Sequence, residues 1–224
     1  MLEQSGIVAN CRMNRERTLS GTNGYDTELG YNPFDLLLSK LCPGRTVGWL
    51  DLCCGSGRAL IEAANHIQMM QLADRCEVIG VDLVGMFARE TADQSCLKLV
   101  TASLTSWYPN RQFEVISCVH GLHYIGDKLG LISRAASWLT EDGVFLSNLS
   151  MENIKLSDGR PVKKIVAAEL RKCGLVYDAT RKRVFCHGRR QIELPFRYLG
   201  SDDQAGPNYT GQPAVDSYYE LLIA

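Results

Sequence analysis

Short apolar runs alternate with stretches of helical character between residues 47 and 149, and this alternation limits the possible folds more than any other feature of the sequence. The apolar runs, which predict strands, lie at 47–52, 77–82, 97–102, 113–119 and 144–149. Helices are predicted between them at 58–71, 85–93 and 127–139. Strands that alternate with helices of about ten residues form parallel β-α-β units with right-handed crossovers. The sequence therefore predicts a doubly wound α/β fold with a mostly parallel sheet and helices on both faces.

The two ends of the chain do not follow this pattern. The first thirty or so residues are polar and contain several glycines, which predicts a mobile arm; Asn32 and Pro33 then begin a short helix over 33–41, with Asn32 as its cap. Later, a helix over 161–173 precedes two β-rich runs at 175–186 and 191–199. Because the connection between these runs is short, we expect a C-terminal antiparallel hairpin. Residues 201–224 predict a loop-like tail with a short aromatic end.

The composition disfavours several classes of partner. Lys and Arg number 24 against 25 Asp and Glu, a formal net charge of −1, so the chain lacks the overall positive field that attracts nucleic acids or anionic membranes. No stretch of about 18 apolar residues occurs, and the first residues do not resemble a signal peptide. The nine cysteines are an odd number and several lie in apolar runs, which indicates free thiols in a reducing compartment. No Cys-x-x-Cys pair occurs, so neither a zinc ribbon nor a thioredoxin-type redox site is indicated. We expect a cytoplasmic, non-membrane protein.

The turn after the first predicted strand indicates a nucleoside ligand. It reads Asp51-Leu52-Cys53-Cys54-Gly55-Ser56-Gly57, and its two glycines allow the backbone to approach a ligand closely. Asp82 ends the second strand 25 residues after Gly57, where an acidic residue binds ribose hydroxyls in nucleoside-binding folds. Leu60 stands where the dinucleotide fingerprint has a third glycine or alanine, and no Gly-Lys-Ser/Thr is present. A nicotinamide cofactor and a nucleoside triphosphate are therefore disfavoured.

The same turn resembles motif I of class I S-adenosylmethionine-dependent methyltransferases, in which an acidic residue lies four positions before the first glycine of Gly-x-Gly. The run at 113–118 followed by Leu122-His123-Tyr124 is similar to the family's fourth strand and its Leu-His-His sequence, with Tyr124 in place of the second histidine. Residues 139–145 resemble the family's Leu-x-Pro-Gly-Gly turn into strand five. The resemblance covers roughly Asp51 to Leu149. It implies an arm with a cap helix (1–44), a Rossmann-like methyltransferase domain (45–200) and a C-terminal tail (201–224).

The resemblance also implies S-adenosylmethionine as the cofactor and assigns residues to it. Gly55, Ser56 and Gly57 would hold the methionine end, and Asp82 would hold the ribose. Many members carry an aspartate that binds adenine after strand three, where this chain has Ser103 and Leu104. The expected cofactor-binding residues are Asp51, Cys53, Gly55, Ser56, Gly57, Asp82, Leu83, Ser103, Leu104 and Cys118. Asp51 has two possible roles: contact with the methionine end, often through water, or bracing of the turn by accepting backbone amides.

Two histidines follow the fourth strand, at the expected rim of the methyl-transfer pocket. His120 and His123 are candidate catalytic residues, because histidine titrates near neutrality and an alcohol, phenol or amine acceptor loses a proton around transfer. Packing in the sheet is the alternative role. A metal site with Cys118 is disfavoured because no third and fourth ligands are evident, so we expect no metal. On the substrate side we expect Tyr25, Tyr31 and Tyr124.

For the acceptor, the sequence favours an oxygen or nitrogen of a small-molecule metabolite. Family members that methylate base amines often carry Asn/Asp-Pro-Pro-aromatic after strand four, and residues 119–124 lack it. An alternative is a methyltransferase that acts on RNA, protein or a carrier-bound substrate through a basic C-terminal hairpin. Residues 155–197 hold 12 Lys and Arg against four acidic residues, which indicates either a solvated face or a site for an anion. A nucleoside-binding protein without catalytic activity is the other alternative.

Overall fold

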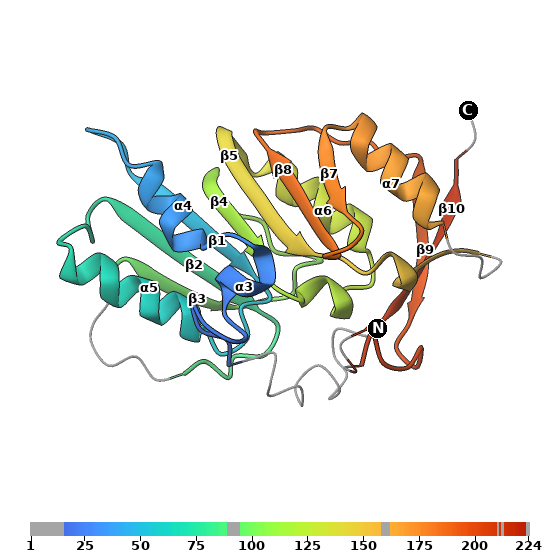
Figure 1. Ribbon diagram of the computed structural model, residues 1–224, viewed down its shortest axis with the longest axis horizontal. Coiled ribbons are helices and arrows are strands. Elements are labelled where there is room, and N and C mark those ends of the chain that lie inside the picture. The colour runs from blue at the N-terminus through green and yellow to red at the C-terminus, as the bar shows by residue number, and fades with distance from the viewer. Residues whose placement is uncertain (1–15, 89–94, 158–161, 210, 212, 223–224) are drawn as a thin grey trace.

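The computed structural model describes residues 16–88, 95–157, 162–209, 211 and 213–222. Its centre is a seven-stranded sheet of order β3-β2-β1-β4-β5-β8-β7 (Figure 1). The strands are β1 (Val47–Leu52), β2 (Cys76–Asp82), β3 (Leu97–Thr101), β4 (Phe113–Cys118), β5 (Leu139–Asn148), β7 (Leu175–Asp178) and β8 (Arg183–His187). The first five are parallel to one another, and β8 runs antiparallel to both of its neighbours, β5 and β7. The predicted doubly wound, mostly parallel sheet is confirmed.

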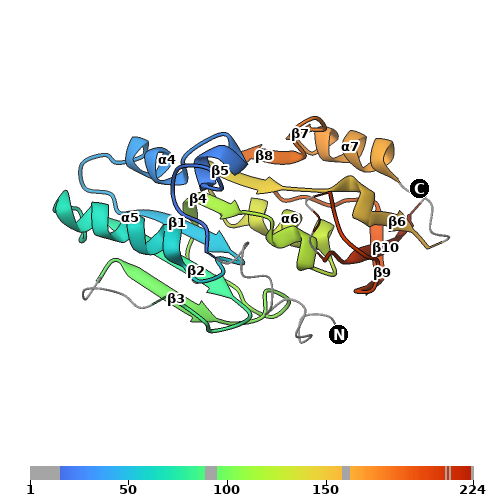
Figure 2. The same cartoon turned by 60° about the horizontal axis from the view of Figure 1, so that its bottom comes forward.

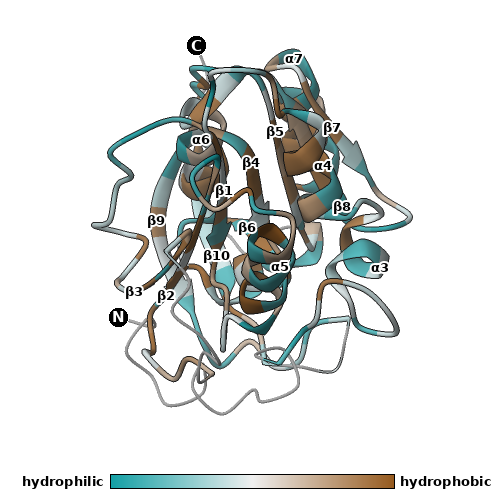
Figure 3. Cartoon of the chain, turned by 90° about the vertical axis from the view of Figure 1, so that its left-hand side faces the viewer, coloured by the Kyte–Doolittle hydropathy of each residue, from teal (hydrophilic) through white to brown (hydrophobic). Residues whose placement is uncertain are grey.

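Helices cover both faces of this sheet, so its middle strands are apolar on both sides. The helices are α3 (Tyr25–Leu29), α4 (Pro33–Ser39), α5 (Arg58–Met69), α6 (Lys128–Ser137) and α7 (Lys163–Lys172). One core cluster joins the sheet to α3, α4 and α5, and the other joins it to α6 and α7. Every residue of β1 and β4 is buried, as expected for parallel strands with helices on both faces. In Figure 3 the ribbon is mostly brown along β4 and β5, the colour of hydrophobic residues.

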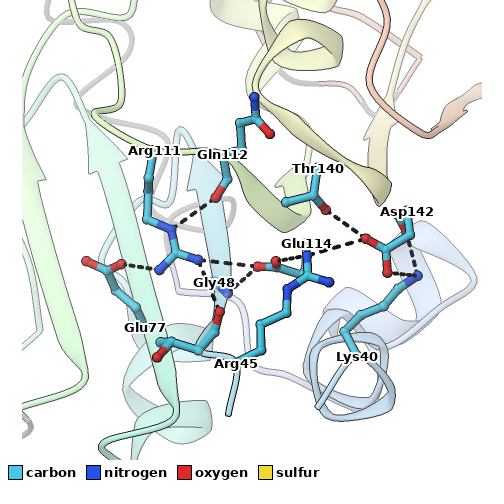
Figure 4. A network of polar contacts seen from close by, with 10 residues as sticks. Lys40, Arg45, Gly48, Glu77, Arg111, Gln112, Glu114, Thr140 and Asp142 are labelled. Atoms are coloured by element: carbon cyan, nitrogen blue, oxygen red, sulfur yellow. Dashed lines mark hydrogen bonds and ion pairs between the residues drawn. The ribbon is translucent and has the colours of Figure 1, made fainter. Parts of the chain in front are cut away.

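The amino ends of the strands are joined by charged side chains. The buried carboxylate of Glu114 accepts a hydrogen bond from the Gly48 amide at 2.6 Å and pairs with Arg45 at 2.7 Å and Arg111 at 3.5 Å. Arg111 also pairs with Glu77 at 2.9 Å (Figure 4). Each cation thus links strands that are far apart in sequence, and the network lies at the end of the sheet opposite the glycine turn.

A second sheet of three strands packs beyond β5. It consists of β6 (Ile154–Leu156), β9 (Phe196–Asp202) and β10 (Asp216–Leu221), with β10 in the middle, parallel to β6 and antiparallel to β9. Figure 2 shows it at the end of the molecule away from α5 and β3. The buried hydroxyl of Tyr219 accepts from the Leu129 amide at 3.1 Å and donates to Asp127 at 3.0 Å, which joins β10 to the start of α6.

Several local predictions are confirmed closely, and others are wrong. The predicted Asn32 cap is present: its side chain accepts from the Phe34 amide at 2.9 Å at the start of α4. Residues 85–88 are irregular rather than helical, and the remainder of that predicted helix, 89–93, lies outside the described residues, as do 1–15 of the arm and Pro161. Residues 141–143, expected as a turn, belong to β5, whose pairing with β4 shifts register there.

The C-terminal hairpin forms from other residues than predicted. The run at 175–186 is two strands, β7 and β8, and the run at 191–199 contributes to β9 in the second sheet. The prediction of a hairpin across 187–190 is therefore wrong, because the turn lies at 179–182. There the Asp178 carboxylate accepts from the amides of Thr180 and Arg181, both at 2.9 Å, and Lys182 has a φ of 51°.

The tail and the arm are also more regular than predicted. Residues 216–221 form β10, so this part of the tail is not a loop. Residues 25–29 form α3, and Tyr25 and Leu29 of this helix are buried against the sheet. The division of the chain at residues 44 and 200 stays a prediction.

Candidate active site

The site lies where the strand order reverses, at the carboxyl ends of β1 and β4. The turn after β1 is tightly wound: φ is 60° at Cys53, 61° at Gly55 and 73° at Gly57. A cysteine rarely adopts such a φ, so the surrounding structure must hold Cys53 there. A side chain at Gly121 would lie 2.5 Å from the Cβ of Cys53 and 2.7 Å from the sulfur of Cys118, which leaves room only for glycine. The turn and the residues after β4 are therefore in close contact.

Asp82 braces this turn against the loop after β2. One of its carboxylate oxygens accepts from the Gly55 amide at 2.9 Å, and the other accepts from the Val84 amide at 3.0 Å. Asp82 is buried, so it is not a solvent-exposed helix cap. A carboxylate has about four acceptor sites, so it can receive several donors at once. Among the neighbouring predicted residues, Ser56 is buried and Leu83 is half-buried.

Asp51 is fully buried and receives hydroxyl hydrogen bonds rather than backbone amides. The Tyr25 hydroxyl donates to it at 2.7 Å, and the Ser117 hydroxyl donates to its other oxygen. Burial raises the pKa of Asp51 to about 7. The indole of Trp49 donates to Ser117 at 2.8 Å and packs edge-on against the Tyr25 ring at 6.1 Å. Asp51 thus joins α3 to β4, and Tyr25, expected beside the substrate, is committed to this contact.

Three other predicted cofactor residues lie in the turn after β3 or in the core. The hydroxyl of Ser103 accepts from the Thr105 amide at 3.2 Å and lies 2.7 Å from the Thr105 hydroxyl. Leu104 and Cys118 are buried in the core cluster on the α6 face of the sheet. Ser103 therefore closes the turn that follows β3, and its position at that strand end is the one expected from the sequence.

His120 pairs with an acidic residue of α3. Its Nε2 lies 2.8 Å from Oε2 of Glu28, whose Oε1 is 2.6 Å from the guanidinium of Arg17. Asn148 at the end of β5 accepts from the His120 amide at 3.2 Å and donates to the Glu28 carbonyl at 3.1 Å. His120 itself has a φ of 55°, an uncommon conformation outside glycine that these bonds hold in place.

His123 and Tyr209 complete the cluster around His120. The ring centroid of His123 is 5.3 Å from that of His120 and 5.5 Å from that of Tyr209. His120 is 2% exposed and His123 0%. In the part of the chain that the structure describes, Nδ1 of His120 and both nitrogens of His123 are buried without a hydrogen-bond partner. Lys182 lies over the Tyr209 ring, with its Nζ 3.8 Å from the centroid.

The Glu28 carboxylate determines which ring nitrogen of a neutral His120 carries the proton. The hydrogen bond from His120, together with the charge of Arg17, lowers the pKa of Glu28 to about 2, so Glu28 is ionised at neutral pH. A carboxylate only accepts hydrogen bonds, so Nε2 of His120 is the donor and a neutral ring has an unprotonated Nδ1. Burial lowers the pKa of His123 well below its ordinary value, so His123 is neutral. The carboxylate therefore orients the ring so that Nδ1, which has no hydrogen-bond partner among the described residues, is the nitrogen that can accept a proton in neutral His120.

The sequence predicted some members of this cluster and missed others. His120 and His123 lie together, as the short spacing after β4 requires. Tyr31 is instead on the other side of α3 beside Phe185, with ring centroids 6.3 Å apart, and Tyr124 is half-buried at the end of the 3-10 turn Gly121–Tyr124. Sequence reasoning missed Arg17, Glu28, Asn148 and Tyr209. No local pattern marks them, because they come from three distant parts of the chain.

The described residues contain neither a metal-binding set of side chains nor a membrane-spanning helix. Among them, no set of three or more His, Cys, Asp or Glu side chains is arranged to hold a metal ion. Within the same ranges, none of the helices has the length and apolar character needed to span a bilayer.

Comparison with known proteins gives a family for this chain. A family model described as a methyltransferase domain matches residues 31–164, more than half of the chain. Among curated proteins, no sequence matches.

Solved structures resemble the chain only distantly. Coclaurine N-methyltransferase bound to N-methylheliamine and S-adenosylhomocysteine is 17% identical over 57% of this chain and 36% of its own, with a TM-score of 0.41. The CurJ carbon methyltransferase is 14% identical over 67% and 50%, with a TM-score of 0.48. The N-methyltransferase NodS from Bradyrhizobium japonicum WM9, in complex with S-adenosylhomocysteine, is 13% identical over 80% and 96%, with a TM-score of 0.45. The chain thus spans only 36% and 50% of the first two structures.

Proposed function

Because the chain belongs to the methyltransferase-domain family, we propose that it transfers a methyl group from S-adenosylmethionine to an oxygen or nitrogen of a small-molecule metabolite, with His120 as the base. The observation that carries this proposal is the pair of half-buried Glu28 and buried His120, in which Nδ1 of His120 has no hydrogen-bond partner among the described residues. An enclosed base suits an acceptor small enough to enter the cluster.

The residues at the end of β1 are compatible with the cofactor. Gly55 and Gly57 have positive φ values, so no side chain fills the inner side of the turn, and the Asp82 carboxylate lies beside it. We assign the methionine end to residues 55–57, the ribose to Asp82 and the adenine neighbourhood to Ser103 and Leu104. Bound S-adenosylmethionine would supply a methyl group on a sulfonium, and the neutral thioether S-adenosylhomocysteine would leave as the methyl group is transferred.

The chain's own contribution is alignment and movement of one proton. Nδ1 of His120 takes the proton from the acceptor's O–H or N–H as the nucleophile attacks, and the imidazolium that forms is stabilised by Glu28 at 2.8 Å. Arg17 holds Glu28 in place. The rings of His123 and Tyr209 exclude water from the cluster and fix where an acceptor can lie.

The test compares His120→Ala and Glu28→Gln with wild type on a panel of phenols, alcohols and amines, measured as release of S-adenosylhomocysteine. We expect His120→Ala to lower turnover by about 10² or more, because general-base assistance contributes about 10² to 10⁴ in rate. The loss should shrink at alkaline pH, where the acceptor ionises unaided. Glu28→Gln should lower turnover without a matching rise in KM, because the amide neither fixes the imidazole tautomer nor stabilises the imidazolium.

Matched controls are His187→Ala and Glu193→Gln, which change exposed residues outside the cluster. Affinity for S-adenosylhomocysteine should stay within a few-fold of wild type in all four variants. Wild-type turnover in His120→Ala would contradict the role of His120 as the general base. Turnover with RNA or protein, and with no member of the panel, would overturn the small-molecule acceptor.

A further inference from the structure

A groove of about 530 Å³ lies between the end of α3 and the β7–β8 hairpin, apart from the histidine cluster. Figure 1 shows β8 and β7 extending the sheet beyond β5. The floor of the groove is a row of apolar side chains from three neighbouring strands: Phe185 of β8 stands opposite both Leu146 of β5 and Val176 of β7. Residues directly opposite in a sheet share a face, so these three side chains form one apolar surface.

One wall of the groove is aromatic. Tyr31 follows α3 and lies over Phe185, with ring centroids 6.3 Å apart and planes tilted by 33°. Tyr31 is 56% exposed and Val176 63%, and both line the groove, so its apolar lining is open to a ligand. The volume lies within the range of about 300–1,000 Å³ typical of small-molecule sites. A flat apolar group would cover both side chains.

One end of the groove carries an uncompensated positive charge. Arg183 lies two residues before Phe185, on the same face of β8, and its guanidinium donates to the Thr27 carbonyl at 2.6 Å. Asp178 is its partner across the strands, but the Asp178 carboxylate pairs with Arg181 at 3.1 Å. Within the described ranges no acidic side chain lies within 4 Å of Arg183, and its buried Nε has no hydrogen-bond partner.

We propose that this groove is a second ligand site, which binds a small anion with a flat apolar body, such as an aryl carboxylate. The carboxylate lies against Arg183, and the ring lies on the Leu146–Phe185–Val176 floor beside Tyr31. Among the described basic residues between 155 and 197, Arg181 and Arg183 line the groove, together with Asp178, and Arg183 is the one assigned to the ligand. Arg181 is neutralised by Asp178. Helix α3 separates the two sites, because Glu28 contacts His120 while Leu29 and Gly30 line the groove.

The experiment measures binding rather than methyl transfer, so its outcome is independent of the proposed function. Naphthalene-2-carboxylate is titrated into wild type, Arg183→Gln and the control Arg189→Gln by calorimetry, with the neutral naphthalene-2-carboxamide in parallel. Arg189 is exposed and lies outside the groove. We expect Arg183→Gln to weaken carboxylate binding about tenfold, the effect of losing a charge-assisted hydrogen bond. Arg189→Gln should stay within twofold of wild type, and carboxamide binding should not change in either variant.

A second variant keeps the test decisive if Arg183→Gln loses the contact with Thr27 and unfolds. Tyr31→Ala removes an exposed ring and should weaken both probes about equally, with the melting temperature and S-adenosylhomocysteine affinity unchanged. The proposal is overturned if wild type does not bind the carboxylate, if Arg183→Gln and Arg189→Gln behave alike, or if Tyr31→Ala leaves binding of both probes intact.

Discussion

Asp82 has two roles: it stabilises the turn after β1, and it is the residue proposed to bind the ribose of the cofactor. Its two oxygens accept from the amides of Gly55 and Val84, which sets the shape of the turn. The same carboxylate is the proposed ribose acceptor. A single side chain therefore orders the turn and would receive charge-assisted bonds from the ligand that the turn holds.

Asp82→Asn separates these two roles, because an amide oxygen still accepts from one backbone amide but the charge is lost. Loss of a charge-assisted pair costs on the order of 2–3 kcal/mol, so we expect affinity for S-adenosylhomocysteine to fall at least tenfold. Calorimetry measures this, with Asp74→Asn as the control at an exposed position. Unchanged affinity in a folded Asp82→Asn protein would mean that the ribose lies elsewhere.

For individual site residues, the sequence predicts those whose positions follow from a local element. It misses those that only tertiary packing brings into the site. His120 and His123 are three residues apart, and Asp82 ends a strand, so their positions follow from the elements. Glu28 is 92 residues from His120, and its five-residue helix has no periodicity that marks it. The two tyrosines of the arm were expected on the substrate side, but Tyr25 donates to Asp51 while Tyr31 turns toward Phe185.

At the scale of elements, prediction succeeded for the central sheet because its strands are buried on both faces and are short apolar runs. It failed for the hairpin because the Asp178 turn interrupts a run that looks continuous in composition. Strand β10 was missed for another reason. It has mixed polarity, and its pairing with β6 and β9 depends on segments about 60 and 15 residues away.

Lys128 of α6 holds the second sheet, and replacing it should lower the free energy of unfolding. Its buried Nζ donates to the carbonyls of Ile125 at 2.8 Å and Val215 at 2.7 Å and is within hydrogen-bond distance of the Ser217 hydroxyl at 2.8 Å. Lys128→Met leaves these acceptors buried and unpaired, so we expect the free energy of unfolding to fall by about 2–3 kcal/mol. Urea denaturation measures the loss, with the exposed Lys163→Met as control.

The difference in unfolding free energy between wild type and Lys128→Met should also depend on pH, in a direction that the pKa of Lys128 determines. Burial lowers the pKa of Lys128 from 10.5 to about 7. Between these values the unfolded chain binds the proton and the folded chain does not, so wild-type stability from this group rises as pH increases from 7 toward 10. Lys128→Met cannot titrate there, and the difference in unfolding free energy should be larger at pH 9 than at pH 7. An equal difference at both pH values would contradict the burial of a neutral amine.

At the scale of the whole molecule, hydrogen bonds join the two sheets, and we expect them to unfold as one cooperative unit. Tyr219 bonds to both Asp127 and Leu129, and the Val215 amide donates to the His123 carbonyl at 2.9 Å, directly behind the site. The second sheet is therefore attached where the chemistry is proposed to occur.

Hydrogen exchange followed by mass spectrometry tests whether the two sheets unfold together. We expect the amides of β10 to be protected within about tenfold of those of β5, because both should exchange through the same global opening. The exposed segment 203–206 serves as an internal control that exchanges rapidly. Rapid exchange of β10 beside a protected β5 would show that the second sheet opens by itself.

Helix α3 contacts His120 through Glu28 and presents Gly30 to the Arg183 guanidinium, whose Nη1 lies 2.3 Å from where a Cβ at position 30 would stand. The histidine cluster and the groove thus share one five-residue helix, and any coupling between them would pass through α3. Coupling between two sites is reciprocal: a ligand in the groove would change the affinity for an acceptor at the cluster by the same factor by which that acceptor changes the affinity for the groove ligand.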